Sequence, residues 1–221
     1  LAKTAPELGI AFVAMERNIA DLPKVVELGL RLGAEHFSIS NVIAHNEKMK
    51  GETLYEEELR KWNPKRAQVE LSRMDLDDER VTSALKGLME TGSRALGIPE
   101  LELFPVKNRC PFIEKGSMSV RWDGAVSPCL SLLHTHDFYL GDAKRKSHAY
   151  QVGTVGDRPL LEIWNDPEYL DLRERIDDFR FSPCTTCRSC ERIEQNLQDC
   201  QGNDEPACGG CLWAQGLIRC P

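Results

Sequence analysis

Apolar residues in the N-terminal part of the chain follow two successive patterns. The run Gly9–Met15 is short and continuous, which is typical of a buried strand. After it, Asp21 and Pro23 are residues that begin helices, and Gly33 is a residue that ends them. Residues 36–43 then predict a second strand. The segment therefore predicts a strand–helix–strand unit with parallel strands and a right-handed crossover.

Two strands do not form a stable sheet alone. We therefore expect residues 1–60 to be α/β in class and to form the C-terminal portion of a larger partial (β/α) barrel. The chain begins with Leu1 rather than Met, so we also expect it to be part of a longer protein.

A helical linker is expected over residues 61–104. The preceding residues 46–64 are polar and charged. Residues 77–96 predict a helix, and residues 101–106 alternate as a strand does. The apolar side chains at helical spacing are Val81, Leu85, Leu88 and Met89.

The last region, residues 105–221, is expected to be α+β. Asp123-Gly124 lies between two strand-like runs and predicts a β-hairpin, with a type I′ turn that needs positive φ at both residues. The other expected elements are a polar loop over 134–150, a short strand over 152–155, a helical turn over 159–164 and a helix over 167–178.

Charge and hydropathy exclude two classes of partner. The net charge is −7 and the pI is about 5.4, so we expect no nucleic-acid partner. No apolar run approaches the ~18 residues of a membrane span, so we expect no membrane partner. The first residues do not read as a signal peptide, and we expect a cytoplasmic protein.

Cysteine is confined to the C-terminal half, where all nine residues occur. A disulfide framework is typical of a small secreted chain with an even cysteine count, so this pattern predicts metal binding instead. The expected hairpin returns the first two thiols to one end of the ribbon, and the CxxC steps let successive thiolates converge on one centre. Iron–sulfur clusters and zinc both fit thiolate ligands. The candidate metal ligands are Cys110, Cys129, Cys184, Cys187, Cys190, Cys200, Cys208, Cys211 and Cys220.

The order of these residues carries a family resemblance. Cys110 is followed by thirteen residues, Gly124, four residues and Cys129, and then by Cys184-x2-Cys187 and the later cysteines. This order resembles the SPASM domain of radical S-adenosylmethionine enzymes. The segments 161–165 and 169–173 look similar to that family as well, and residues 12–18 with the 36–43 strand resemble the last strands of its partial barrel.

The resemblance implies a cysteine-rich domain with a β-hairpin and helices around two auxiliary [4Fe-4S] clusters. Cys190 and Cys200 lie in an insert that the family pattern lacks, and they either replace Cys208 or complete the first cluster. The ligand sets that the family implies are Cys110, Cys129 and Cys211 for the first cluster and Cys184, Cys187, Cys208 and Cys220 for the second.

One family motif is not present in these residues. The Cys-x3-Cys-x2-Cys that binds the catalytic cluster does not occur, so the chain by itself is not expected to cleave S-adenosylmethionine. The resemblance places S-adenosylmethionine and a third [4Fe-4S] cluster in a full-length parent. It further implies a peptide or protein substrate and a reductant such as ferredoxin or flavodoxin. The run 208–216 looks most like maturases for tungsten-containing oxidoreductases.

Two residues at the end of the second strand are candidates for binding the cofactor. Asn41 and His45 lie where the active sites of barrels gather, although the start of a polar loop is a simpler explanation for them. His134 and His136 follow Cys129 and are candidates for iron or for exposed loop residues.

Three functions remain open at this point. The chain is the auxiliary-cluster part of a radical enzyme that modifies a peptide or protein, a stand-alone electron-transfer module, or a zinc-binding structural domain.

Overall fold

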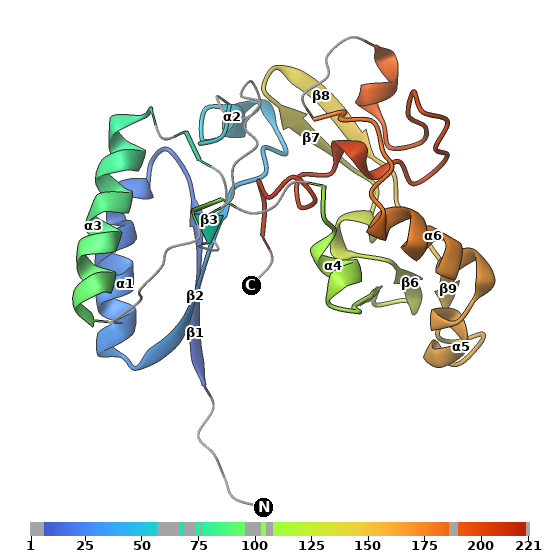
Figure 1. Cartoon of the computed structure of the whole chain (residues 1–221), viewed down its shortest axis with the longest axis horizontal. Coiled ribbons are helices and arrows are strands. Elements are labelled where there is room, and N and C mark those ends of the chain that lie inside the picture. Colours follow the sequence, from blue (N-terminus) through green and yellow to red (C-terminus); the bar gives the residue numbers. More distant parts are fainter. Residues whose placement is uncertain are drawn as a thin grey trace, which may run out of the picture. The chain divides into compact units, whose positions relative to one another are not determined.

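The computed structural model describes residues 7–56, 67–68, 74–75, 77–95, 103–104, 108–185 and 190–219. The chain forms two compact units, and Figure 1 shows their elements in sequence colours. The first unit comprises Leu1–Ile43, Gly51–Pro105 and Gly216–Pro221, and the second comprises Ala44–Lys50 and Val106–Gln215.

The first unit contains the predicted strand–helix–strand motif. Strand β1 (Leu8–Ala14) pairs in parallel with β2 (Ala34–Asn41), and helix α1 (Leu22–Arg31) lies between them in sequence, after a 3-10 helix at Ile19–Asp21. Asp21 directly precedes α1 as predicted, but its carboxylate accepts no capping hydrogen bond. A partial barrel around this pair of strands stays a prediction.

The prediction that the first strand is buried is wrong. Its side chains alternate in exposure, so that Phe12 packs on the core while Val13 is 46% exposed. The described sheet of this unit has two main strands, β1 and β2, and α1 packs on one of its faces. An apolar run of this kind predicts a strand without showing how many of its faces are covered.

Helices α1 and α3 (Glu79–Ala95) pack side by side, and α3 confirms the helix predicted over 77–96 (Figure 1). Gly29 permits a close approach of α1 to the sheet, because a Cβ there would lie 2.4 Å from Ile10 Cδ1 and 2.6 Å from Phe37 Cε1. The buried core of this unit consists of Ala14, Ile19, Leu22, Val26, Ile39, Leu54, Met74, Val81, Ala84 and Leu85.

Short elements occupy the described parts of the linker region. Helix α2 (Glu47–Lys50) lies within the polar stretch 46–64. Strands β3 (Ala67–Gln68) and β4 (Leu103–Phe104) pair antiparallel, and β4 lies inside the strand predicted over 101–106. Much of the predicted linker lies outside the described residues.

The second unit contains the predicted hairpin. After helix α4 (Pro111–Glu114), strands β5 (Ser119–Val120) and β6 (Ala125–Ser127) pair antiparallel, and β9 (Gly153–Thr154) adds to β6. These strands form one small sheet that ends close to Cys129.

The predicted type I′ turn is wrong. Gly124 has a φ of +88°, but the described non-glycine residues with positive φ do not include Asp123. The turn is closed by Gly124 N, which donates to Arg121 O at 2.9 Å. Asp123 instead accepts a hydrogen bond from Ala125 N at 3.2 Å. The side chain of Asp123 therefore holds the turn, and Gly124 alone supplies the left-handed backbone.

Residues 134–150 are not the polar loop that the sequence predicted. Strands β7 (His136–Leu140) and β8 (Ala143–Ser147) form a second hairpin. Segment 44–50 joins this hairpin, since Tyr139 N donates to Ala44 O at 2.7 Å. Arg145 on β8 is buried, which a solvent-exposed loop would not require.

Two helices complete the second unit, and both were predicted. Helix α5 (Leu160–Trp164) precedes α6 (Pro167–Asp177). Asp166 caps α6, because its carboxylate accepts from Glu168 N at 3.0 Å and pairs with Arg158 at 2.6 Å. One buried cluster of this unit consists of Tyr169, Leu172, Ile176 and Phe181.

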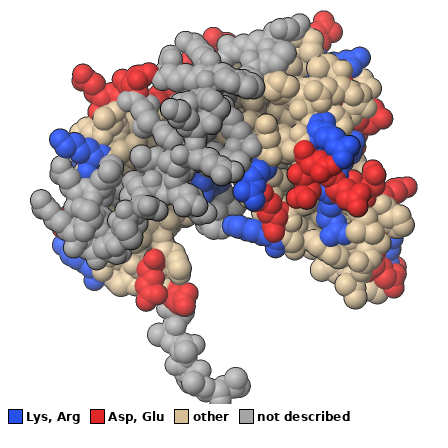
Figure 2. Space-filling view, in the orientation of Figure 1, with Lys and Arg blue, Asp and Glu red and all other residues tan. Residues whose placement is uncertain are grey.

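Surface features are consistent with the mixed charge of the chain. No helix among the described residues has the length and apolar character needed to cross a membrane. On the face in Figure 2, Lys and Arg side chains lie close to Asp and Glu over the described part of the chain. Lys144 pairs with Asp137 at 2.8 Å in this way.

Candidate metal centre

Cys110 and Cys129 lie on either side of the β5–β6 hairpin, as predicted. Cys110 directly precedes α4 and is half-buried, while Cys129 directly precedes a 3-10 helix at Leu130–Leu132 and is 8% exposed. Burial raises the pKa of both thiols. Backbone N–H groups of the following turns, at Phe112 and Ile113 for Cys110, act in the opposite direction. These N–H groups favour the thiolate, the form of cysteine that binds metal.

Cys208 and Cys211 lie on a short turn near the end of the chain. A 3-10 helix at Cys208–Gly210 is closed by Cys211 N, which donates to Cys208 O at 3.0 Å. Gly209 allows this turn to approach the backbone at Ser182, because a Cβ on Gly209 would lie 1.9 Å from Ser182 O. Glycine at this position is therefore a packing requirement.

The hairpin and this turn bring four thiols into mutual interaction. Burial raises the pKa of Cys129, and the charges of Cys211 and Cys110 raise it further. Burial likewise raises the pKa of Cys208 far above its usual value. The charges of Cys211, Cys129 and Cys110 raise this pKa further. Cys110 and Cys208 also pack against the same core around Tyr169. The structure thus gathers Cys110, Cys129, Cys208 and Cys211.

A single metal ion and a cluster differ in how close together they hold their thiolate ligands. Among the residues that the structure describes, no three His, Cys, Asp or Glu side chains converge closely enough to hold one metal ion. Sulfurs on one tetrahedral zinc ion lie about 3.8 Å apart, since each Zn–S bond is about 2.3 Å. A four-iron cluster gives each thiolate its own iron, so its ligands stand farther apart. Four thiolates satisfy the coordination of either kind of site.

The other cysteines lie around this group in different settings. Cys184 is 9% exposed and close to the 208–211 turn, because a Cβ on Gly210 would lie 3.7 Å from Cys184 Cβ. Cys190 and Cys200 are exposed, and Cys200 Sγ lies 3.0 Å from Ser182 Oγ. The predicted ligands Cys187 and Cys220 lie outside the described residues. None of the described cysteines forms a disulfide.

Asp199 organises the insert that carries Cys190 and Cys200, a role for which the sequence analysis found no signal. Its side chain is fully buried and accepts hydrogen bonds from Ser182 N at 2.9 Å, from Gln201 N at 2.9 Å and from Asn203 N at 3.0 Å. Burial raises the pKa of Asp199, but these donors outweigh it and the net shift is downward. An ionised Asp199 therefore closes the loop between Ser182 and Asn203.

Tyr169 is a second residue that sequence analysis did not assign. It is 1% exposed, and its hydroxyl makes no hydrogen bond within the described residues. Burial raises the pKa of Tyr169 to about 12; Arg173 lowers it, and Cys129 and Cys110 raise it. The phenol thus remains protonated, and two of the gathered thiols act on it electrostatically.

The residues proposed for cofactor binding make contacts with other described residues. Asn41 is 3% exposed, and its Nδ2 donates to Leu217 O at 2.8 Å. His45 Nδ1 lies 3.0 Å from Asp137 O, and its ring stacks edge-on with His136 at 5.5 Å between centroids. Nothing in these contacts tests a role in S-adenosylmethionine binding, which stays a prediction.

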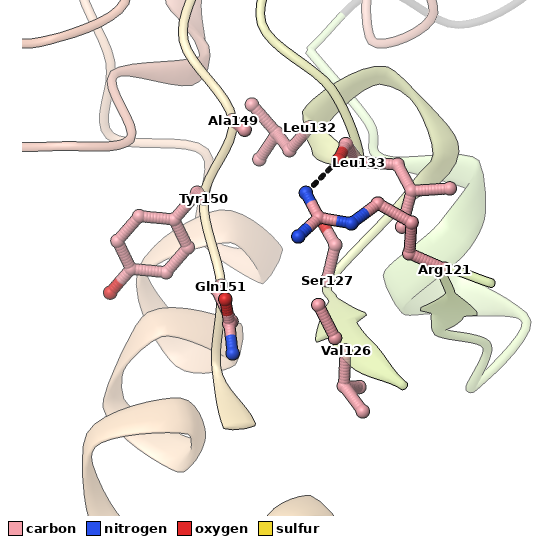
Figure 3. Close-up of a pocket in the computed structure, with 9 residues that line it drawn as sticks. Arg121, Val126, Ser127, Leu132, Leu133, Ala149, Tyr150 and Gln151 are labelled. Carbon is pink, nitrogen blue, oxygen red and sulfur yellow. Dashed lines mark hydrogen bonds between the residues drawn. The ribbon is translucent and has the colours of Figure 1, made fainter. Parts of the chain in front are cut away.

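A small cavity lies between strand β6 and residues 149–151 (Figure 3). It has a volume of about 120 Å³ and is lined in part by Arg121, Ser127 and Tyr150. Arg121 Nη1 donates to Leu133 O at 3.4 Å across it, and Ser127 Oγ donates to Cys129 O at 3.1 Å. Since small-molecule pockets usually measure about 300–1,000 Å³, this cavity is too small for a peptide.

Comparison with known proteins agrees with this geometry. Residues 110–191 match the SPASM family, which is described as an iron-sulfur cluster-binding domain. That match confirms the family resemblance predicted from the cysteine order, and the family that it names binds iron–sulfur clusters.

A particular relative extends the similarity beyond this domain. The tungsten-containing aldehyde ferredoxin oxidoreductase cofactor-modifying protein of Pyrococcus furiosus is 26% identical over 219 residues. The alignment covers 98% of this chain and 56% of the relative, so the chain spans little more than half of that protein. The predicted resemblance to maturases of tungsten-containing oxidoreductases is confirmed. No solved structure is significantly similar to the chain.

Proposed function

We propose that this chain is the auxiliary-cluster part of a radical S-adenosylmethionine maturase that modifies a peptide or protein. The observation that carries the proposal is the group of thiols at Cys110, Cys129, Cys208 and Cys211, inside and just after the region that matches SPASM. The name of the Pyrococcus furiosus relative supports a maturase, with an oxidoreductase or its cofactor as the substrate class.

Packing supports one revision of the ligand sets. We assign Cys208 to the first cluster with Cys110, Cys129 and Cys211, because Cys208 and Cys110 pack against the same buried core around Tyr169. The family pattern places Cys208 in the second cluster instead. The second [4Fe-4S] cluster then has Cys184 and Cys187, with two of the three remaining cysteines, Cys190, Cys200 and Cys220.

The residues of the chain bind and shield these clusters. When bound, the clusters supply one-electron transfer or a binding site for substrate. The core around Tyr169 and Phe181 keeps water away from Cys110 and Cys208. The buried thiols must lose their protons on ligation, and the positive iron centres stabilise the thiolates that burial alone disfavours.

The rest of the reaction belongs to the parent protein. The 221 residues contain no Cys-x3-Cys-x2-Cys, so S-adenosylmethionine and the third [4Fe-4S] cluster are proposed for a segment outside them. We further propose a cytoplasmic protein, because reduced thiols persist there, with a ferredoxin or flavodoxin as the reductant.

Anaerobic purification followed by iron, sulfide and zinc analysis tests the cofactor. Two [4Fe-4S] clusters predict about eight iron and about eight sulfide per chain. A colourless protein that holds zinc after anaerobic reconstitution would favour the zinc domain and overturn the proposal. If the coding sequence before Leu1 lacks Cys-x3-Cys-x2-Cys, the stand-alone electron-transfer module is favoured over the maturase.

The ligand assignment is tested by comparing single and double variants. Cys110→Ser and Cys208→Ser should each remove about half of the iron, and the double variant should remove no more, because both residues serve one cluster. Cys110→Ser combined with Cys184→Ser should remove nearly all of it. If Cys208 is a ligand of the second cluster, the Cys110/Cys208 double variant will lose both clusters.

A further inference from the structure

Tyr169 carries a buried hydroxyl group that requires a partner. The residue lies in the first turn of α6 and is 1% exposed. Its hydroxyl oxygen makes no hydrogen bond to any residue that the structure describes. A hydroxyl removed from water without a new partner is unfavourable, and buried hydroxyls are therefore nearly always paired. The setting of Tyr169 indicates a partner other than the described protein atoms.

The ring of Tyr169 is held in a fixed position. Trp164 packs edge-on against it, with the ring centroids 5.8 Å apart. The Arg173 guanidinium lies 4.0 Å from the Trp164 ring centroid and 4.9 Å from that of Tyr169. Arg173 Nη2 donates to Trp164 O at 2.8 Å, which fixes the guanidinium in turn. The direction of the hydroxyl is thus set by packing.

The thiols Cys110 and Cys129 lie in the surroundings of this hydroxyl. Cys110 packs against the core to which Tyr169 belongs, and both thiols act electrostatically on the phenol. Tyr150 contacts the same core, but the charged groups that act on its hydroxyl are Arg175, Glu168 and Glu205 and not these two thiols.

We propose that the Tyr169 hydroxyl donates a hydrogen bond to a cysteine sulfur of the cluster held by Cys110 and Cys129, and that this bond raises the reduction potential of that cluster. The inference rests on the proposed function, since it requires the cluster to be present. On reduction the cluster gains one electron from an external donor, no covalent bond changes, and Tyr169 keeps its proton. A hydrogen bond to sulfur stabilises the more negative, reduced state more than the oxidised state.

Reduction potentials of the iron-loaded chain test the proposal. Tyr169→Phe removes the hydroxyl and keeps the ring. We expect the equilibrium constant for reduction of one cluster to fall about tenfold, which is about 59 mV toward negative potential for a one-electron couple. The potential of the other cluster should not move. An unchanged potential for both clusters in iron-loaded Tyr169→Phe would overturn the inference.

Tyr150→Phe is the matched control. It removes the same hydroxyl from a tyrosine that contacts the same core, and it should leave both potentials unchanged. Equal shifts in Tyr150→Phe and Tyr169→Phe would overturn the inference, because they would show a general effect of packing.

A second probe covers the case in which Tyr169→Phe does not bind iron. A 3-fluorotyrosine at residue 169 has a more acidic phenol and is a stronger donor, so it should shift the same potential in the positive direction. A fluorinated chain with the wild-type potential would overturn the inference. A different result would overturn the proposed function itself, namely a wild-type chain that binds neither iron nor sulfide.

Discussion

The Asp123 carboxylate shows how one side chain holds the hairpin that separates two of the thiols. Arg121 Nε and Nη2 donate to its two oxygens at 2.8 and 2.7 Å, and Ala125 N donates at 3.2 Å. The Arg121 hydrogen bond is the main reason that the pKa of Asp123 is lowered to about 2. An ionised Asp123 therefore stabilises the turn between Cys110 and Cys129.

This shift predicts a pH dependence with a definite sign. The pKa of Asp123 in the unfolded chain is about 3.9, above its folded value, so its contribution to stability is present above about pH 4. The contribution should be lost as the pH falls from about 4 to about 2. The carboxyl carbon of Asp123 should titrate near pH 2 by NMR.

Asp123→Asn provides the comparison, because it cannot ionise. The difference in unfolding free energy between wild type and Asp123→Asn should shrink as the pH is lowered through that range. A carboxyl that titrates near pH 4 would contradict the predicted contact with Arg121.

At the scale of elements, the close packing of one helix and one turn each depends on a glycine, which has no side chain. Gly29 brings α1 onto β1 and β2, and Gly209 brings the 208–211 turn onto the backbone at Ser182. In each case the sequence shows a glycine inside an apolar or cysteine-rich stretch, and the close contact appears only in three dimensions. Both positions give predictions with neighbouring controls.

Gly209→Ala should disturb the candidate metal centre. Its Cβ would lie 1.9 Å from Ser182 O, and a backbone atom cannot move aside as a side chain can. We expect a loss of about 1–3 kcal/mol in unfolding free energy, together with reduced iron content. Gly210→Ala is the matched control, because its Cβ would meet only side-chain atoms, Arg145 Nη1 at 3.3 Å and Cys184 Cβ at 3.7 Å. Equal iron content in the two variants would contradict the predicted contact.

Gly29→Ala should destabilise the first unit. Its Cβ would overlap Ile10 and Phe37, so α1 must move away from the sheet at a cost of about 1–3 kcal/mol. Leu28→Ala, at a neighbouring position that is 47% exposed, should change the stability by less than about 0.5 kcal/mol. Denaturant unfolding of both variants measures the difference, and similar losses would contradict the packing of α1.

At the scale of the whole molecule, the two units have separate cores. The core of the first unit is formed by aliphatic side chains of α1, α3 and the sheet, whereas that of the second adjoins the cysteines. If the clusters are bound as proposed, the second unit depends on metal for part of its stability, and the first does not.

Removal of the clusters by chelation should therefore affect the two units differently. Hydrogen exchange should become faster in α6 and in residues 199–211, with little change in α1 and β2. Mass spectrometry of exchanged peptides measures both regions in one experiment. A uniform loss of protection across both units would contradict separate stabilisation.

Sequence reasoning succeeded where the evidence was local. Helix α6 was predicted because Asp166 and Pro167 begin it, and the β5–β6 hairpin because Asp123-Gly124 is a turn signal. The hairpin β7–β8 was missed because Lys144, Arg145 and Lys146 form a charged run. Its pairing with Ala44 and the burial of Arg145 depend on contacts that no local pattern shows.

The main helices, the first hairpin and the cysteine order that resembles the SPASM domain could be predicted from the sequence, because each depends on spacing along the chain. Contacts in three dimensions bring Cys208 and Cys110 against one core, bury the Tyr169 hydroxyl without a partner among the described residues, and bring His45 to Asp137, 92 residues away. The physical reason is that packing and burial select such partners, and neither is encoded in the spacing of residues along the chain.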